Sequence, residues 1–343
     1  MKLAQLKKDA AFGLGILRGR PFQVLIQVSN RCNMKCSFCD FWPNVAPRAQ
    51  ELSAAEYARI ADELSELGTF LVSVEGGEPL LRPDILEVVS AFAKQHVPVL
   101  FTNGWHINPE RAKALFASGL VHASVSIDYA RAEQHDRKRG LPGTWERAWR
   151  AVATLRDAAP HGGKQVHVMT VLMKDNAADL EALLQQSAKL GVGHQVTLLS
   201  TAGFRRKPGT PGENELPPPG TGEAVLALWR RYPHLRYFRD YFARMDAFLG
   251  EGELPVCRAG VQSFNIDHVG NVSPCIEKID LVAGNVRQES LPDIHRRLVA
   301  QAEQDVIAGC RDCWTACRGF VSALGDGGTV QGFRDMSARM RSW

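Results

Sequence analysis

Buried-strand patterns alternate with helix patterns through the first two hundred residues of this 343-residue chain. Short apolar runs typical of buried strands lie at residues 22–28, 70–74, 97–101, 123–127, 166–172 and 196–199. Helix patterns separate them at 53–68, 85–95, 109–119, 145–158 and 178–190, the first opened by a Ser53–Glu56 capping box. Parallel strands require such crossovers. The sequence therefore predicts an α/β fold in which six βα units form a partial (β/α)6 TIM-like barrel, with an open doubly wound sheet as the alternative.

Eight cysteines fall into two groups, one near each end of the chain. The first group is Cys32, Cys36 and Cys39, and the second is Cys257, Cys275, Cys310, Cys313 and Cys317. The 217 residues between Cys39 and Cys257 contain no cysteine. Disulfide frameworks are typical of small secreted chains, so clustered cysteines in a chain of this size favour metal ligation.

Charge and hydropathy argue against a nucleic-acid-binding protein and against a membrane-spanning one. The net charge of +4 comes without a dense run of Lys and Arg, which argues against a nucleic-acid interface. No apolar stretch is long enough to span a membrane, and the N-terminal apolar run is too short for a signal peptide. We expect a cytoplasmic protein, with a weak membrane-surface contact through residues 1–20 as an alternative to simple packing of that segment on the domain.

The first cysteine group has the form C-x3-C-x2-C and begins four residues after the first expected strand. Loops at the carboxyl ends of parallel strands carry the active sites of such folds. Three thiolates on one loop can hold a 4Fe–4S cluster and leave its fourth iron without a protein ligand. Zinc is the alternative, although a structural zinc site usually closes with a fourth ligand, and this loop offers no obvious one.

This motif resembles the signature of the radical S-adenosylmethionine (SAM) superfamily, in which an aromatic residue, here Phe38, precedes the third cysteine. The resemblance implies a partial barrel whose cluster binds the methionine moiety of SAM at its open iron. It also implies reductive cleavage of SAM to a 5′-deoxyadenosyl radical, which abstracts hydrogen from a substrate carbon. The cofactor then carries the difficult chemistry, and the protein supplies placement and electronic tuning.

Further segments resemble family motifs and occur in order along the barrel. Gly76, Gly77, Glu78 and Pro79 match the segment that holds the methionine amino group, and Ser126 and Asp128 match the segment that reaches the ribose and carboxylate. Arg139 lies in an HD-x-x-RG segment that implies a salt bridge to the methionine carboxylate, and Asn103 ends the third strand on the same face. For Asp128 the alternative is a helix or loop cap. For the segment around Arg139 the alternative is a solvated charge run.

The second cysteine group resembles the SPASM and twitch extensions, small Cys-rich α+β domains that carry auxiliary clusters. The resemblance implies one auxiliary 4Fe–4S cluster on Cys257, Cys275, Cys310 and Cys313, with Cys317 as a substitute ligand or a spare thiol. Two auxiliary clusters ligated only by cysteine would need eight thiolates, and five are present. A zinc ribbon and inert core cysteines are the alternatives.

These assignments predict five segments. They are an N-terminal lead-in helix (1–20), the radical SAM barrel (21–201), a Pro/Gly-rich connector with a helical segment (202–250), the auxiliary iron–sulfur domain (251–325) and a C-terminal tail (326–343).

The expected function is hydrogen abstraction in natural-product, peptide or cofactor biosynthesis, assisted by the auxiliary cluster, with the exact reaction unassigned. The alternatives are a peptide maturase that needs a separate recognition partner, since only about 21 residues precede the first strand, and an enzyme that modifies lipids or isoprenoids. The alternative to an enzyme is a non-catalytic protein that carries an iron–sulfur cluster or binds zinc. Expected partners are a small-molecule or peptide substrate and an electron donor such as flavodoxin or ferredoxin. No hydrogen donor or catalytic base can be assigned. Cys317, Tyr129, Trp42 and the several histidines are candidates, with a structural role as the alternative for each.

Overall fold

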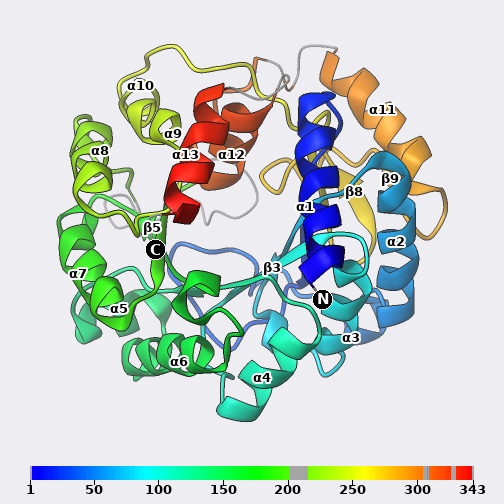
Figure 1. Cartoon of the computed structure of the whole chain (residues 1–343). Helices are drawn as coiled ribbons and strands as arrows, with labels where there is room; N and C mark the ends of the chain where they lie inside the picture. Colours follow the sequence, from blue (N-terminus) through cyan, green and yellow to red (C-terminus); the bar gives the residue numbers. More distant parts are fainter. Residues whose placement is uncertain (1, 201–214, 304–306, 308, 326–329, 342–343) are drawn as a thin grey trace.

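A curved parallel sheet forms the centre of the computed structural model, which describes the chain except for residues 1, 201–214, 304–306, 308, 326–329 and 342–343 (Figure 1). Its first six strands are β1 (Gln23–Ser29), β2 (Leu71–Gly76), β3 (Val97–Thr102), β4 (His122–Ser126), β5 (Val166–Leu172) and β6 (Gly193–Leu198). Each strand pairs in parallel with the next one along the chain. This order confirms the partial barrel and rules out the doubly wound sheet, in which the strand order reverses.

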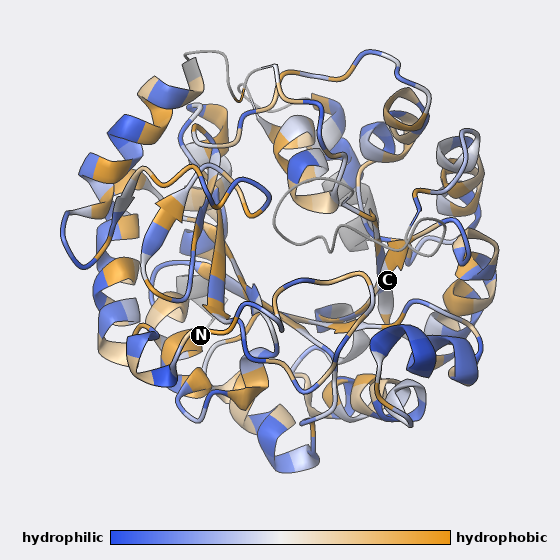
Figure 2. Ribbon diagram, turned by 180° about the vertical axis from the view of Figure 1, so that it is seen from behind, coloured by the Kyte–Doolittle hydropathy of each residue, from blue (hydrophilic) through white to orange (hydrophobic). Residues whose placement is uncertain are grey.

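Helices cover the outer face of the barrel. They are α2 (Ala54–Leu67), α3 (Ile85–Ala93), α4 (Pro109–Ala117), α5 (Ala132–Arg139), α6 (Thr144–Ala158) and α7 (Leu180–Leu190). The predicted capping box is present, since Ser53 and Glu56 exchange side-chain and backbone hydrogen bonds at the start of α2. Figure 2 shows polar residues on the outward surfaces of these helices and apolar residues along the strands. The main hydrophobic core fills the layer between the two.

The C-terminal part continues the same sheet. Strand β7 (Ser263–Ile266) pairs in parallel with β1, and β8 (Asn271–Ser273) and β9 (Gly284–Asn285) follow as antiparallel strands. Helices α11 (Leu291–Glu303), α12 (Ala316–Leu324) and α13 (Val330–Arg341) complete this part. The sheet therefore connects the second cysteine group directly to the strand that leads into the first.

The connector differs from its expected form. Residues 201–214 of the Pro/Gly-rich stretch lie outside the described residues. The helical segment expected within residues 202–250 is divided into three helices: α8 (Thr221–Arg231), α9 (Arg239–Ala243) and α10 (Met245–Leu249). Pro233 explains the first break, since a proline disfavours helical geometry in the preceding residue.

The lead-in segment forms helix α1 (Lys2–Leu17), which lies across the N-terminal ends of the strands. Lys8 donates a hydrogen bond of 2.9 Å to the carbonyl of Ala93, at the end of α3. None of the helices described is long and apolar enough to cross a membrane.

Candidate functional site

The loop that carries the first three cysteines is held by the end of helix α5. The Lys35 amide donates to the Arg139 carbonyl at 3.2 Å, and the Ser37 amide donates to the Lys138 carbonyl at 3.0 Å. These bonds use carbonyl groups that the last turn of a helix leaves without intrahelical partners. Residues 135, 138 and 139 are buried, so the reading of this segment as a solvated charge run is wrong.

Desolvation sets the proton affinity of the thiols in this loop. Burial raises the pKa of Cys32 to about 11 and that of Cys36 to about 12, and the nearby Arg139 cation offsets only part of the effect. Cluster binding requires thiolates, so iron must displace protons from thiols that burial makes weaker acids. Within the described residues, no three Cys, His, Asp or Glu side chains are placed to hold a single metal ion. A cubane cluster, in contrast, binds each thiolate at a different iron.

The end of β2 packs directly on the start of the cysteine loop. The Gly77 amide donates to the Ser29 carbonyl at 2.6 Å, and the Glu78 amide donates to the Arg31 carbonyl at 2.8 Å. A Cβ atom at Gly77 would lie 2.3 Å from the Arg31 carbonyl oxygen. The two segments can approach this closely only because position 77 is a glycine.

Glu78 lies behind the cavity wall and orients the end of β3. Its carboxylate is fully buried and accepts hydrogen bonds from the Thr102 hydroxyl (2.7 Å) and from the amides of Asn103 (2.8 Å) and Leu80 (3.0 Å). Burial raises its pKa, and these three donors oppose that rise. The Asn103 side chain in turn donates to Asn33 at 2.8 Å, within the cysteine loop. Glu78 therefore acts on the site through Asn103.

A buried ion pair joins the ends of β4 and α5. Arg139 donates to one oxygen of Asp128 through Nε (2.8 Å) and Nη2 (2.5 Å), and the Val171 amide donates to the other oxygen at 3.0 Å. Burial works to lower the pKa of Arg139, but the charge and hydrogen bonds of Asp128 together with the nearby Cys36 and Cys39 raise it. The guanidinium also lies 5.3 Å from the centre of the Phe38 ring. This pair therefore fixes a positive charge beside the cysteine loop.

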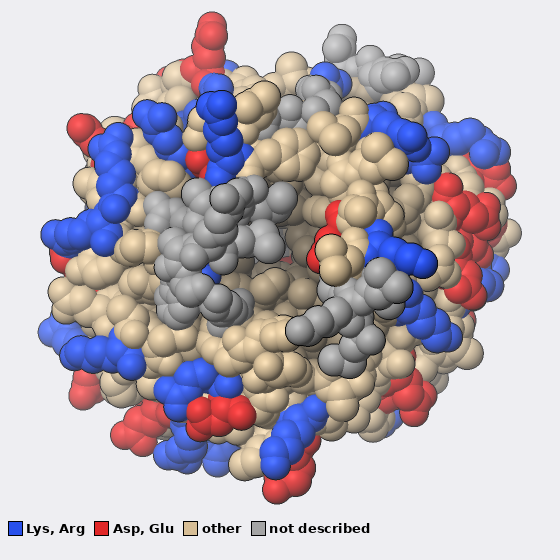
Figure 3. Space-filling model, viewed as in Figure 1, with Lys and Arg blue, Asp and Glu red and all other residues tan. Residues whose placement is uncertain are grey.

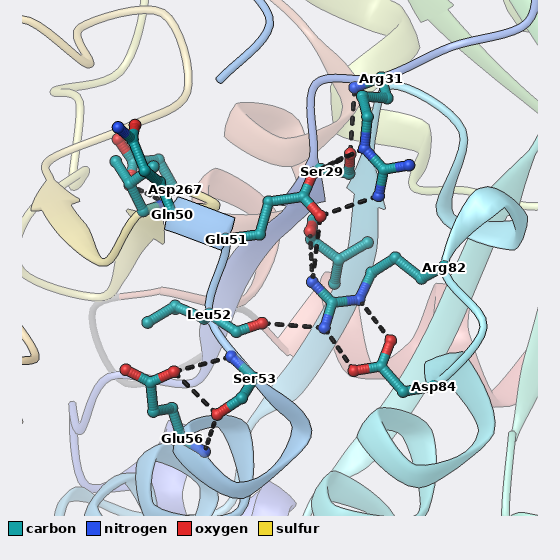
Figure 4. A network of polar contacts seen from close by, with 12 residues as sticks. Ser29, Arg31, Gln50, Glu51, Leu52, Ser53, Glu56, Arg82, Asp84 and Asp267 are labelled. Carbon is teal, nitrogen blue, oxygen red and sulfur yellow. Dashed lines mark hydrogen bonds and ion pairs between the residues drawn. The ribbon is translucent and has the colours of Figure 1, made fainter. Parts of the chain in front are cut away.

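A second polar network anchors the same loop and was not identified from the sequence (Figure 4). Glu51 accepts from the Ser29 hydroxyl at 2.5 Å and from Arg31 at 2.8 and 3.1 Å. Arg82 donates to the carbonyls of Val28 (3.0 Å) and Leu52 (2.8 Å). Burial raises the pKa of Glu51, but the two hydrogen-bonding partners and the nearby cations lower it below its usual value. The network holds the end of β1 against the loop that precedes α2.

One cavity of about 1330 Å³ occupies the lumen of the barrel. Alternate residues of each strand face it, as the two-residue period of a strand requires. Six of the predicted cofactor-binding residues line it: Phe38, Gly76, Gly77, Asn103, Ser126 and Arg139. The three cysteines of the first group line it as well. Glu78, Pro79 and Asp128 are buried behind its wall.

The five cysteines of the second group surround a smaller pocket of about 40 Å³. Burial raises the pKa of Cys313 to about 12, and the neighbouring Cys317 adds to the rise. Cys317 lines both this pocket and the barrel cavity, next to the Thr315 hydroxyl at 3.1 Å. The structure therefore gathers all five predicted ligands, and it places Cys317 between the two cavities.

Known proteins resemble this chain along most of its length. A sequence model of the radical SAM superfamily matches residues 26–186, and one of an iron–sulfur cluster-binding domain, SPASM, matches residues 257–314. Mycofactocin maturase MftC of Mycobacterium ulcerans is 31% identical over 316 residues, which cover 88% of this chain and 83% of that protein. The chain belongs to the radical SAM superfamily.

Three further proteins match over most of the chain. AdoMet-dependent heme synthase of Nitratidesulfovibrio vulgaris is 28% identical over 293 residues, or 79% of this chain and 77% of that protein. The crystal structure of Streptococcus suis SuiB matches the fold with a TM-score of 0.63 at 18% identity, covering 85% of this chain and 67% of that one. The structure of anSMEcpe with bound AdoMet gives a TM-score of 0.64 at 17% identity, covering 94% and 96%.

Membership of the radical SAM superfamily defines the cofactors of the enzyme. They are a 4Fe–4S cluster with SAM in the barrel and auxiliary iron–sulfur ligation in the SPASM region. The residues present fit these groups, because each cysteine group surrounds a cavity and thiolates are the protein ligands of iron–sulfur clusters. Family membership therefore replaces the two alternatives, that the cysteines bind zinc or that they are inert core residues.

Proposed function

We propose that this radical SAM enzyme abstracts hydrogen from a carbon of a peptide substrate held in the barrel lumen. The observation that carries the proposal is the single cavity that joins the cysteine loop, the predicted SAM-binding residues and the lumen. When bound, the cluster and SAM supply a carbon-centred radical at the cysteine end of this cavity. Relatives whose names state a peptide substrate or maturase activity support the peptide class, among them PqqA peptide cyclase of Methylocella silvestris, 31% identical over 172 residues.

Each predicted residue then has a task that follows from its position. Cys32, Cys36 and Cys39 hold the catalytic cluster, and the ring of Phe38 in the same loop packs against the Arg139 guanidinium. The wall residues Gly76, Gly77, Asn103, Ser126 and Arg139 contact SAM. Glu78, Pro79 and Asp128 are positioning residues, since they are buried behind that wall. Asp128 neutralises part of the Arg139 charge, and the remaining N–H groups of Arg139 can bind a carboxylate.

The auxiliary cluster is proposed to lie on Cys257, Cys275, Cys310 and Cys313, which surround the smaller pocket. Cys317 is then a thiol at the wall between this cluster and the substrate. Among the other candidate hydrogen donors, Trp42 lines the main cavity, whereas Tyr129 is buried and donates to Asp175 at 2.8 Å. An electron donor such as flavodoxin or ferredoxin, a separate peptide-recognition partner and a cytoplasmic location complete the proposal.

A second candidate is an apolar small-molecule or lipid substrate in cofactor biosynthesis. The mostly apolar lumen favours it, since Leu25, Val99, Phe101 and Met169 all face the cavity.

Deuterium transfer distinguishes the two candidates. The reconstituted enzyme would receive SAM and dithionite with either a fully deuterated peptide digest or a fully deuterated lipid extract. The 5′-deoxyadenosine formed would then be analysed by mass spectrometry. Deuterium acquired from the peptide pool is the expected result. Deuterium acquired only from the lipid pool would contradict the peptide proposal and support the second candidate.

A further inference from the structure

A group of polar side chains faces the cavity at the end opposite the cysteine loop. His122 begins β4, and His167 lies at the start of β5. Their ring centres are 5.1 Å apart, and Arg236 lines the same part of the cavity. None of these three residues has a role in the proposed SAM site. We call them the lower polar group.

The imidazoles are placed to bind something in the lumen. His167 is 5% exposed, and its Nδ1 atom has no hydrogen-bond partner within the described part of the chain. The Nδ1 atom of His122 likewise has no hydrogen-bond partner among the described residues. Both Nδ1 atoms are enclosed by protein, so the other edges of the two rings, which line the cavity, are the parts available to a ligand.

Gly193 is adapted to this arrangement. It pairs directly with His167 in the β5–β6 ladder, on the lumen face. A Cβ atom at position 193 would lie 2.2 Å from Cδ2 of the His167 ring and 2.9 Å from its Nε2 atom. The ring therefore occupies space that any other residue at 193 would take.

The charges favour an anion at this place. Burial lowers the pKa of His122 to about 4, with a further contribution from the Arg236 cation. Burial likewise lowers the pKa of His167, followed by the effects of His122 and Arg236. Both rings are therefore neutral N–H donors at pH 7, and Arg236 supplies a positive charge. Three carboxylates also reach the cavity wall: Glu75 near the end of β2, Asp9 of α1 and Asp335 of α13. Asp335 already accepts from the Arg239 amide (2.8 Å) and the Gln331 side chain (2.6 Å).

The distance between the two ends defines the length of a bound molecule. Along β4, the side chains of His122, Ser124 and Ser126 all face the lumen, and Ser126 belongs to the predicted SAM site. At about 3.3 Å per residue, His122 lies about 13 Å below Ser126. The walls between them are mainly apolar. In the view of Figure 3 the described surface is hollowed at its centre, between helices α1 and α13, so the lumen reaches the surface at this end.

We propose that the lower polar group binds the carboxylate end of an elongated, largely apolar substrate whose reacting carbon lies about 13 Å away, beside the cysteine loop. The inference rests on the proposed function, because it assumes that the substrate enters the lumen. A fatty acid and the free C-terminus of an apolar peptide offer this chemistry equally. An extended tetrapeptide spans about 13 Å.

The test is binding of two matched pairs of probes to the reconstituted enzyme, measured by calorimetry without oxygen. One pair is decanoate and 1-decanol, and the other is an acetylated Leu-Leu-Val-Leu peptide with a free or an amidated C-terminus. At least one carboxylate is expected to bind at least about tenfold more tightly than its neutral counterpart. The pair that shows this difference tells whether the substrate is a fatty acid or a peptide. Equal affinities within both pairs, or binding of neither carboxylate, would overturn the proposal and leave a site filled by water.

Variants locate the site. Arg236→Gln and Gly193→Ala are each expected to weaken the favoured carboxylate about tenfold, the second because the new methyl group displaces the His167 ring. Gly15→Ala is the matched control, since a Cβ atom there meets nothing within 4 Å. Imidazole ¹⁵N signals of His122 and His167 should shift on binding in the wild type. Unchanged signals, or unchanged affinity in both variants, would refute the assignment. Deoxyadenosine formation without any probe tests the proposed function separately.

Discussion

Replacing Gly77 by alanine tests how the cysteine loop and the end of β2 depend on each other. The new Cβ would lie 2.3 Å from the Arg31 carbonyl oxygen and 2.7 Å from the Asn30 carbonyl oxygen, both in the backbone of the cysteine loop. Cβ atoms in real proteins are almost never closer than 3.0 Å to such a neighbour, so the backbone must move by about 0.7 Å to bring the Cβ and the Arg31 oxygen to that separation. Overpacking of this kind costs about 1–3 kcal/mol.

The movement also weakens two hydrogen bonds, from the Gly77 amide to Ser29 and from the Glu78 amide to Arg31. Each contributes about 0.5–1.5 kcal/mol, so we expect a total loss of about 2–6 kcal/mol in the free energy of unfolding. Urea unfolding measured without oxygen gives this quantity. Equilibrium dialysis with labelled SAM should show at least about tenfold weaker binding, because Gly77 and the displaced cysteine loop both line the cavity proposed to hold SAM, and tenfold corresponds to only about 1.4 kcal/mol of binding free energy.

Gly15→Ala in helix α1 is the control, and it should leave both measurements unchanged or slightly raise the stability, because alanine favours a helix over glycine. If Gly77→Ala matches this control in stability and in SAM affinity, the reasoning about the close approach of the two segments is refuted.

Four further substitutions test other parts of the site. Glu51→Gln should lower stability by about 2–3 kcal/mol at pH 7, as measured by urea unfolding. Because the pKa of Glu51 is depressed in the folded protein, Glu51 should stabilise the fold above the usual carboxyl pKa, and this stabilisation should fade as the pH falls through the folded pKa. A difference in unfolding free energy between wild type and variant that does not change with pH would contradict this. Cys317→Ala should keep both clusters by iron analysis, whereas Cys313→Ala should lose the auxiliary one; the reverse result would make Cys317 a ligand. Asp128→Asn should weaken SAM binding about tenfold, because Arg139 loses the ion pair that positions it. An unchanged Kd would show that the Asp128–Arg139 ion pair does not contribute to SAM binding.

The barrel was predictable because its strands are buried on both faces and its helices have clear ends. All six expected strands are present, and β5 has the expected bounds of 166–172. The capping box at Ser53 followed from two residues alone. Local sequence carries such features, since they depend on neighbours within a few positions.

Features that depend on distant pairings were not predictable in the same way. Strand β7 is only four residues long, and its pairing with β1 joins positions about 240 residues apart. Glu51 and Arg82 look like ordinary surface residues in sequence and become buried only when their segments meet. The histidines at 122 and 167 face one lumen because of strand register, which a single sequence does not reveal.

The distinction between wall residues and supporting residues also required coordinates. The motif predicts Glu78 and Asp128 at the site, but not that Glu78 accepts from Asn103 while Asp128 pairs with Arg139. Burial of the charged segment around Arg139 likewise depends on the cysteine loop that packs against it.

Counting iron and sulfide tests the central claim most directly. Wild type and a Cys32→Ala/Cys36→Ala/Cys39→Ala variant would be purified and reconstituted without oxygen, then supplied with dithionite and SAM. We predict about eight irons in wild type and about four in the variant, with 5′-deoxyadenosine formed only by wild type. An unchanged iron content in the variant, or deoxyadenosine formed equally by both proteins, would contradict the assignment of the catalytic cluster to these three cysteines.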